Sequence, residues 1–229
     1  MDSRTVVLSP HLDDAVLSCW HVLQEGETTV VTVFAGVPEA GTAGWWDRLT
    51  GADDSATRVH ERRRENDEAL ALAGASSLTL DLLDAQYRAN GAVPAVAEAL
   101  ADHLHEADVV YAPLASFLSD DHRLVRDAAL GLRDDVRLYA DHPHAGIFGL
   151  PGWVTGRDGE TELDVDAVWR ARMAEAGLDP ATVRGAVHPL DGYSFERKLA
   201  AVRAYRTQVA ALEREAPLDQ LRWEVTWTP

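Results

Sequence analysis

Five short runs of apolar and β-branched residues constrain the fold of this chain most strongly. The runs are TVVLS (5–9), TTVVTVFAG (28–36), SLTLDL (77–82), DVVYAPL (108–114) and VRLYAD (136–141). Segments with helical spacing separate them, near 14–25, 57–74, 93–106 and 121–133. Alternating strands and helices predict an α/β fold with repeated βαβ units around a mostly parallel sheet. Since the strands are continuously apolar, we expect helices to flank both faces of the sheet.

Two polar segments follow strands of this predicted sheet. Residues 10–14 come after the first run, and residues 115–122 come after the fourth. In open parallel sheets the ligand site lies beyond the carboxyl ends of the strands, where the strand order reverses. Both segments are therefore expected at the ligand edge.

The chain after Pro143 has a different pattern. GWVTGRDGETELDV (152–165) predicts a small hairpin with Asp158-Gly159 at its turn. SFERKLAAVRAYRTQVAALERE (194–215) predicts one long helix with Ser194 as its N-cap, and LRWEVTWTP predicts a last edge strand. We expect a single domain over residues 1–229, in which 1–142 form the core and 143–229 form a C-terminal extension packed on it.

Charge and composition narrow the function. Asp and Glu number 38 and Lys and Arg number 21, so the net charge is −17. This charge repels phosphate backbones and anionic lipids, which argues against nucleic-acid or membrane binding and suits a bound cation or a neutral substrate. No signal peptide or 18-residue apolar run is present, which predicts a cytoplasmic location. Cys19, the single cysteine, is expected to be a buried packing residue. A homo-oligomer is compatible with these features.

The segment SPHLDDAVLSCW (9–20) carries a histidine and two adjacent acids directly after the first strand. His11 and Asp14 are three residues apart at a strand-to-helix turn, where their side chains can converge on a metal ion. His122 is the best candidate for a third ligand, and Asp13 is free to accept a proton from water. An equally strong alternative is that Asp13 and Asp14 cap the following helix and that His11 is a hydrogen-bonded loop residue.

The same segment closely resembles the P-H-x-D-D signature of the PIG-L or LmbE-like zinc deacetylases. RVHERRRENDEALALAGA (58–75) is similar to the family's R-x-x-E helix, with Arg62 and Glu65 at the matching positions. Three further segments resemble later family motifs in the same order: LLDAQYR (82–88), SDDHRLVRDAAL (119–130) and KLAAVRAYRTQV (198–209). The resemblance covers nearly all of the chain except roughly residues 150–190.

This resemblance implies a fold, a cofactor and an activity. The fold is a Rossmann-like sheet, and the implied Zn²⁺ ligands are His11, Asp14 and His122, with Asp13 as the general base. Members of the family remove an acetyl group from an amino sugar or cleave a related amide. We therefore expect a zinc-dependent N-deacetylase that acts on an N-acylated small molecule, such as an amino sugar or a sugar-bearing metabolite.

The sequence departs from the family pattern at Ser119, where the family usually has a histidine thought to donate a hydrogen bond or proton. Losing one oxyanion donor can lower turnover on the order of 100- to 1000-fold. His144, after the fifth strand, is our candidate for a replacement, and His188 is a weaker one. A larger-acyl amidase of the same family, or a catalytically weakened binding homologue, are the alternatives.

Four further residues are candidates for substrate contacts, together with Ser119. Trp45 and Trp46 are adjacent in a loop after the second strand, which suggests stacking on a sugar, although one or both could instead pin the loop to the body. Arg62 and Arg88 could hold a polar substrate group, or could form ion pairs with Glu65 or Asp84.

Overall fold

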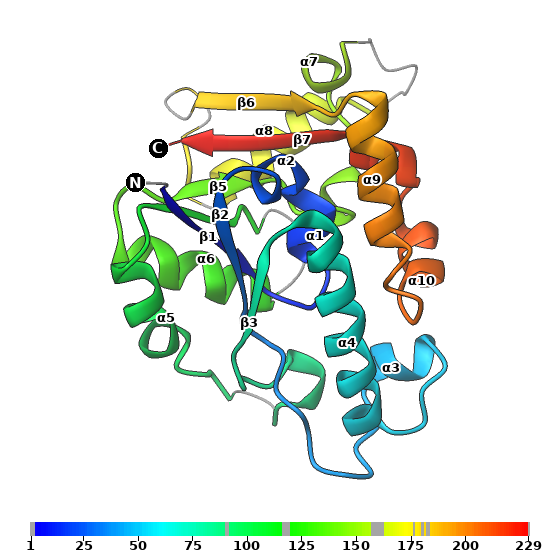
Figure 1. The fold of residues 1–229 in the computed structure, drawn as a ribbon. Helices are drawn as coiled ribbons and strands as arrows, with labels where there is room; N and C mark the ends of the chain where they lie inside the picture. Colours follow the sequence, from blue (N-terminus) through cyan, green and yellow to red (C-terminus); the bar gives the residue numbers. More distant parts are fainter. Residues whose placement is uncertain are drawn as a thin grey trace.

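The computed structural model describes residues 3–89, 92–115, 120–156, 163–175, 177–179, 181 and 184–228 (Figure 1). The strands are β1 (Arg4–Ser9), β2 (Glu27–Thr32), β3 (Ser76–Thr79), β4 (Val109–Pro113), β5 (Arg137–Tyr139), β6 (Arg184–Pro189) and β7 (Trp223–Thr228). The helices are α1 (Asp14–Ser18), α2 (Trp20–Leu23), α3 (Trp45–Leu49), α4 (Ser55–Ala73), α5 (Val96–His105), α6 (Asp120–Leu132), α7 (Gly152–Thr155), α8 (Val165–Glu175), α9 (Gly192–Val202) and α10 (Val209–Glu215). Short 3₁₀ turns are η1 (Ala85–Tyr87), η2 (His144–Gly146) and η3 (Leu218–Arg222).

The strands form one seven-stranded sheet in the order β3-β2-β1-β4-β5-β7-β6. The first five strands are parallel, and β7 joins antiparallel to both β5 and β6. The chain reverses its direction of travel across the sheet between β1 and β4. The loops after these two strands therefore open at the switch point where such sheets bind ligands.

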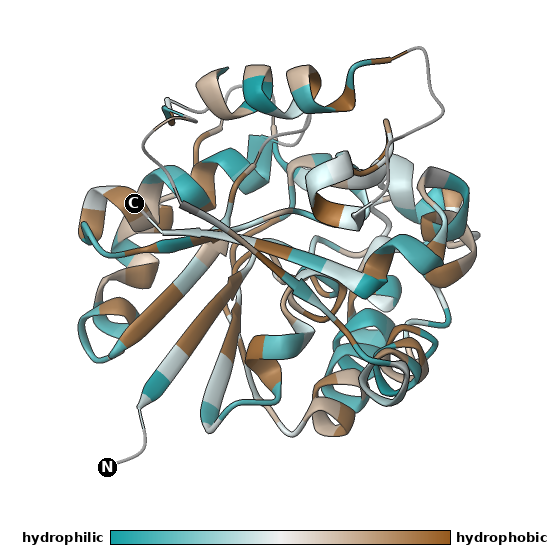
Figure 2. Ribbon diagram, turned by 90° about the horizontal axis from the view of Figure 1, so that it is seen from above, coloured by the Kyte–Doolittle hydropathy of each residue, from teal (hydrophilic) through white to brown (hydrophobic). Residues whose placement is uncertain are grey.

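Alternate residues of the central strands supply two cores. Val6 and Leu8 of β1 face a cluster that includes α5 and α6, whereas Val7 faces a cluster that includes α1, α4 and α9. Figure 2 shows hydrophobic colouring along the central strands and hydrophilic stretches on the surrounding helices. The predicted mostly parallel α/β sheet flanked by helices is confirmed, and Cys19 is buried as expected.

The predicted long helix over 194–215 is wrong, because α9 ends at Val202 and α10 starts at Val209. Between them the chain turns toward α4. The backbone N–H and the hydroxyl of Thr207 both donate to Glu65, and the Tyr205 hydroxyl donates to Asn66. These hydrogen bonds to α4 take the place of the hydrogen bonds that a continuous helix would form. The N-cap is Asp191, which accepts from the backbone N–H of Ser194 at 2.7 Å, rather than Ser194 itself.

Two other C-terminal predictions are also wrong. Gly152–Thr155 is a helical turn, ended by Gly156 with a left-handed φ of 69°, instead of the first arm of a hairpin. The predicted turn at Asp158-Gly159 lies outside the described residues. β7 is an inner strand rather than an edge strand, and β6 forms the edge. Among the described residues, no helix is both long and apolar enough to cross a membrane.

Candidate active site

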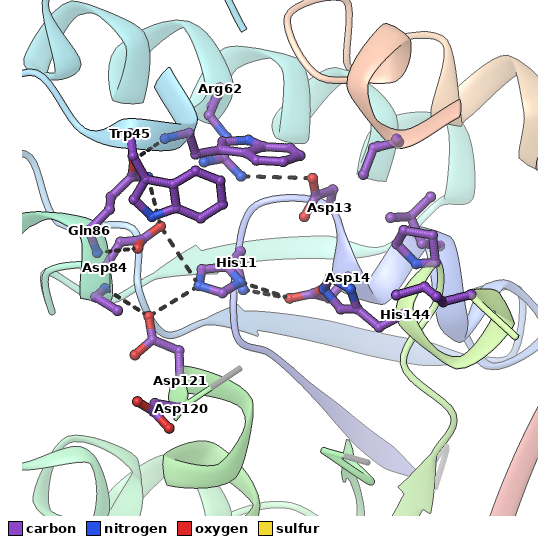
Figure 3. A pocket seen from close by; sticks show the side chains of 16 residues that line it. His11, Asp13, Asp14, Trp45, Arg62, Asp84, Gln86, Asp120, Asp121 and His144 are labelled. Atoms are coloured by element: carbon purple, nitrogen blue, oxygen red, sulfur yellow. Dashed lines mark hydrogen bonds and ion pairs between the residues drawn. The ribbon is translucent and has the colours of Figure 1, made fainter. Parts of the chain in front are cut away.

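Three side chains that could bind metal converge at the switch point. His11 and Asp14 come from the loop and helix start after β1, and His122 comes from the first turn of α6. Asp14 Oδ2 lies 3.5 Å from His11 Nδ1 and 3.4 Å from His122 Nε2. One ligand atom from each residue lies within 4.8 Å of the others. The spacing of His11 and Asp14 thus produces the convergence that the sequence predicted (Figure 3).

The loop after β1 is closed by its own hydrogen bonds. The Ser9 hydroxyl donates to the carbonyl of His11 at 2.7 Å and accepts from the N–H of Ala15 at 3.1 Å. Asp14 Oδ2 also accepts from the backbone N–H of His11 at 2.7 Å. Asp13 occupies the N-cap position of α1, but its carboxylate makes no capping hydrogen bond. Its side chain is therefore available for another role.

A second layer of carboxylates orients the two histidines. His11 Nε2 lies 3.2 Å from Asp121 and 3.7 Å from Asp84. His122 Nδ1 bonds Asp141 Oδ1 at 2.7 Å, and the other oxygen of Asp141 accepts from the N–H of Ala115. Carboxylates that hold the second ring nitrogen are typical of metal-binding histidines.

These orienting carboxylates were not predicted from the sequence, although two signals for them were present. Asp141 directly follows β5 at the ligand edge, and Asp121 adjoins the predicted ligand His122. Ala115, which binds Asp141, has a left-handed φ of 54°, a conformation that costs free energy in a non-glycine residue.

The environment of His122 Nε2 indicates that these residues suit a metal ion. This buried nitrogen has no hydrogen-bond partner in the described part of the chain, although it faces Asp14. Buried polar atoms are normally paired, so an orphaned imidazole nitrogen beside a carboxylate marks a place for a missing ligand. Two imidazoles and one carboxylate are also the donor set of a catalytic zinc site.

The pKa values of these groups reflect concentrated negative charge. Burial would lower the pKa of His11, but Asp84, Asp121 and Asp14 outweigh it and raise that pKa well above its ordinary value. Burial likewise opposes a raised pKa at His122, which Asp14 and Asp141 produce. For Asp14, burial raises the pKa, yet His122 and His11 bring it well below the usual range. The group therefore favours a bound positive charge, either protons or a metal ion.

Asp13 and Arg62 form a buried ion pair next to the three predicted metal ligands. Arg62 Nη2 lies 3.7 Å from Asp13 Oδ2, and both side chains are buried. Burial raises the pKa of Asp13, Arg62 opposes this, and the net shift is upward. A carboxylate with a raised pKa is a better proton acceptor, as a general base requires. Arg62 does not form the alternative ion pair with Glu65, which instead accepts from Thr207.

Two of the predicted metal ligands, His11 and Asp14, line a cavity of about 540 Å³. Its size is within the range of roughly 300–1,000 Å³ that is common for small-molecule sites. Its lining includes His11, Asp13, Asp14, Arg62, His144 and both tryptophans. Arg88 lies behind the cavity wall, where it donates to Asp121 at 2.5 Å rather than pairing with Asp84.

The two tryptophans have different environments. They lie on α3, not in an irregular loop, with their rings in an edge-to-face contact at 5.6 Å. Trp46 is anchored, because its Nε1 donates to Gln208 and its backbone N–H donates to Gln86. Trp45 is 62% exposed and lies over the cavity (Figure 3). A side chain at Gly44 would overlap Gln86 and Tyr87, so glycine permits this close approach.

His144 also lines the cavity, with its ring 5.6 Å from that of His122. Burial first and His122 second lower the pKa of His144 to about 4, so its imidazole is neutral at pH 7. His188 is remote from this group, because it stacks on His21 with ring centroids 3.8 Å apart. Ser119 lies outside the described residues.

Comparisons with known proteins agree with this geometry. The PIG-L family, described as GlcNAc-PI de-N-acetylase, matches residues 6–132. A teicoplanin deacetylase, solved in a zinc-inhibited form, is 25% identical over 99% of this chain and 97% of its own, with a TM-score of 0.72. The deacetylase of the antimicrobial reagent A40926 pseudoaglycone is 27% identical over 100% and 97%, with a TM-score of 0.71.

A more distant structure shares the fold. N,N'-diacetylchitobiose deacetylase from Pyrococcus horikoshii is 18% identical over 90% of this chain and 71% of its own, with a TM-score of 0.52. A comparison with curated proteins finds no match.

Proposed function

Because this chain belongs to the PIG-L family of N-deacetylases, we propose that it hydrolyses the N-acetyl amide of a small molecule, an amino sugar or a sugar-bearing metabolite. The observation that carries the proposal is the convergence of His11, Asp14 and His122 at the edge of a cavity that His11, Asp13 and Asp14 line. The resemblance to deacetylases of teicoplanin and of A40926 pseudoaglycone supports a sugar-bearing substrate.

In this proposal His11, Asp14 and His122 hold Zn²⁺. Bound there, zinc would supply a Lewis acid and lower the pKa of water to about 7. Asp121 and Asp141 keep the ring nitrogens of His11 and His122 directed toward Asp14. Zinc binding also requires neutral histidines, so their protons must leave as the metal enters.

Asp13 acts as the general base. Its carboxylate accepts a proton from the attacking water, and its raised pKa suits that task. Arg62 keeps Asp13 oriented and opposes the rise in its pKa that burial causes. Once protonated, Asp13 can return the proton to the leaving amine.

His144 is the proposed donor near the reacting carbonyl, in place of the family histidine absent at Ser119. A neutral imidazole carries one N–H, so His144 can donate a hydrogen bond to the developing oxyanion. Trp45, Trp46 and Arg62 are proposed to contact the sugar. Arg88 is proposed to act on substrate only indirectly, because its guanidinium is bound to Asp121.

Metal analysis and an acyl-release assay test this function together. Protein purified without chelators should hold about one zinc per chain, and it should release acetate from a panel of N-acetylglucosamine derivatives. His122→Ala should lose zinc while remaining folded. Arg123→Ala changes the neighbouring, partly exposed position on α6 and serves as the control that retains zinc.

Two outcomes would contradict the proposal. Failure of the parent protein to bind zinc or another divalent ion, even on addition, would remove the enzyme interpretation. Zinc binding with no acyl release from any substrate would instead favour a weakened, ligand-binding homologue.

A further inference from the structure

Helix α3 carries both tryptophans of the cavity wall, and residues of η1 hold its backbone. The N–H of Trp46 donates to the side-chain oxygen of Gln86 at 3.1 Å, and the Tyr87 hydroxyl donates to the carboxylate of Asp47 at 2.5 Å. Asp47 is fully buried. A helix of five residues is too short to be stable in isolation, so α3 depends on such contacts for its position.

The indole ring of Trp46 is held separately, by Gln208. Its Nε1 donates to Gln208 Oε1 at 2.5 Å. Gln208 lies in the turn between α9 and α10, which is close to α3 (Figure 1). The side chain of Gln208 is fully buried and is not part of the cavity lining. Since an indole has a single N–H, this bond fixes the direction of the Trp46 ring.

A chain of hydrogen bonds that ends at a buried carboxylate orients Gln208. Its side-chain N–H donates to the Thr207 hydroxyl at 2.8 Å, and this hydroxyl donates to Glu65 Oε2 at 2.7 Å. The backbone N–H of Thr207 donates to Glu65 Oε1 at 3.0 Å. A carboxylate only accepts, so the hydroxyl of Thr207 gives its proton to Glu65 and accepts from the amide N–H of Gln208. The amide oxygen is therefore directed to Trp46.

The position of the Trp46 ring also affects Trp45. The two rings meet edge to face, with centroids 5.6 Å apart and planes at 79°. Trp45 is 62% exposed, so little of its surface is covered by other groups (Figure 3). A rotation of the Trp46 ring would therefore displace the ring that lies over the cavity.

We propose that Gln208 is a positioning residue for sugar binding. It fixes the ring of Trp46, and through it the ring of Trp45, in the orientation that stacks on the sugar of the substrate. Gln208 acts without touching the substrate, because its side chain is fully buried outside the cavity lining. This inference rests on the proposed function, because it requires that the two tryptophans contact a sugar.

The proposal predicts an effect on binding rather than on chemistry. Rings that are held in place before the sugar arrives need not be ordered during binding, which lowers the free-energy cost of association. The metal ligands and Asp13 are not members of the hydrogen-bond chain from Trp46 to Glu65. Loss of Gln208 should therefore raise KM and leave kcat close to that of the parent.

Gln208→Met tests this prediction, because methionine has a similar length but no donor and only a weak acceptor. We expect KM to rise by roughly 3–10-fold for the N-acetylglucosamine derivative that the parent cleaves fastest. The Kd of acetohydroxamate for the zinc-loaded protein depends on the metal site and should be unchanged. Thermal unfolding should show that the variant remains folded.

Gln24→Met is the matched control. The side chain of Gln24 donates to the carbonyl of Ala73 at 2.6 Å, and Gln24 does not line the cavity. This control loses a comparable hydrogen bond and should keep the KM of the parent. Thr207→Val is a second test variant, since it retains Gln208 but removes the hydroxyl that orients it. It should raise KM in the same direction, and it decides the question if Gln208→Met does not fold.

Nuclear magnetic resonance reports the bond between Trp46 and Gln208 without any substrate. The indole N–H resonance of Trp46 is identified by its absence in Trp46→Phe. In Gln208→Met this resonance should move upfield and its hydrogen should exchange faster with solvent, because the bond is lost. In Gln24→Met it should keep its position.

A double variant tests whether Gln208 acts through Trp46. Trp46→Phe removes the same hydrogen bond from the other side and should also raise KM. Adding Gln208→Met to Trp46→Phe should raise KM little further, because both changes remove one shared interaction. Fully additive effects would show that Gln208 acts by another route, and the inference would be overturned.

The remaining outcomes separate this inference from the proposed function. If the Trp46 resonance is unchanged in Gln208→Met, the positioning role is overturned whatever the activity. If the resonance moves but KM stays at the parent value, the bond only stabilises α3, and the inference is again overturned. If the parent cleaves no N-acetyl sugar although the resonance responds, the proposed function fails, and Gln208 is left with a structural role.

Discussion

Two clusters of buried charge, one at the start of α2 and one at the start of α1, are partnered in different ways. In one, Lys198 of α9 and Glu224 of β7 are both fully buried and lie 2.6 Å apart. Each oxygen of Glu224 receives bonds from two groups, because the backbone N–H groups of Trp20 and His21 and the His21 ring also bind it. Lys198 donates in addition to the carbonyl of Leu221.

The cluster in the cavity is incompletely partnered. His122 Nε2 and Arg62 Nε are buried and have no hydrogen-bond partner in the described part of the chain. His21 Nε2 beside Glu224 is also unpartnered in the described residues, but the carboxylate of Glu224 is fully bonded and joins α2, α9 and β7. In contrast, Asp13, Asp14 and Arg62 of the other cluster line the cavity, where a ligand can reach them. Removing a partner should lower the stability of the protein in the first cluster. In the second cluster it should lower catalytic activity or metal affinity.

The largest expected effect is the loss of stability in Lys198→Met. This change leaves Glu224 buried without its positive partner, which should lower the free energy of unfolding by about 3–5 kcal/mol. Urea denaturation measures the effect, and the zinc content of the folded fraction should be unchanged. Adding Glu224→Gln should recover part of the stability. A loss below about 1 kcal/mol in the single variant would show that the pair is not a structural anchor.

Acid should weaken the same cluster. Burial would raise the pKa of Glu224, but Lys198 and His21 lower it from 4.5 to about 2. A lowered carboxyl pKa gives stability that is fully present above pH 4.5 and is lost as pH falls toward about 2. The loss should be about 3 kcal/mol. Denaturation curves from pH 5 to 2 should be less pH-dependent in Glu224→Gln than in the parent; equal slopes would refute the assignment.

Asp13→Asn tests the chemistry of the cavity cluster. The amide preserves size but cannot accept the proton, so kcat should fall by roughly 100-fold or more. Zinc content and the free energy of unfolding should stay near those of the parent. Full activity in this variant would mean that Asp13 serves only at the start of α1.

His144→Ala should lower turnover by up to roughly 100-fold if His144 donates to the oxyanion. Ser119→Ala should have a far smaller effect. Ser119→His would add a donor, which raises the rate only if the donor position is vacant. Loss of activity in Ser119→His together with a silent His144→Ala would contradict the role of His144.

Asp141→Asn is expected to have the smallest effect. The amide keeps one oxygen that can accept from the N–H of Ala115. It removes the negative charge that binds the His122 ring. Zinc affinity should fall by roughly 10–100-fold, as for other residues that orient metal-binding histidines. Competition with a chelator measures this affinity, and Asp127→Asn, which changes an acid on the same helix as His122, is the control. Unchanged affinity would restrict Asp141 to a structural role.

The sequence alone determined the features that depend on residues close together in the chain or on a general rule of sheet geometry. Alternating apolar runs and helical periods predicted the parallel sheet, since each run must bury its own side chains. The three-residue spacing of His11 and Asp14 predicted their convergence, because one turn of backbone sets it. His122 followed from a general rule, that the carboxyl ends of parallel strands share one edge.

Tertiary structure decided the features that depend on distant partners. The helix predicted over 194–215 breaks because Thr207 bonds Glu65, and Trp46 is anchored by Gln208, 162 residues away. The bond from Asp141 to His122 likewise requires β5 beside β4. Local periodicity encodes which face of an element is apolar, but not which element lies opposite. These hydrogen bonds are therefore set only when the sheet order brings their partners together.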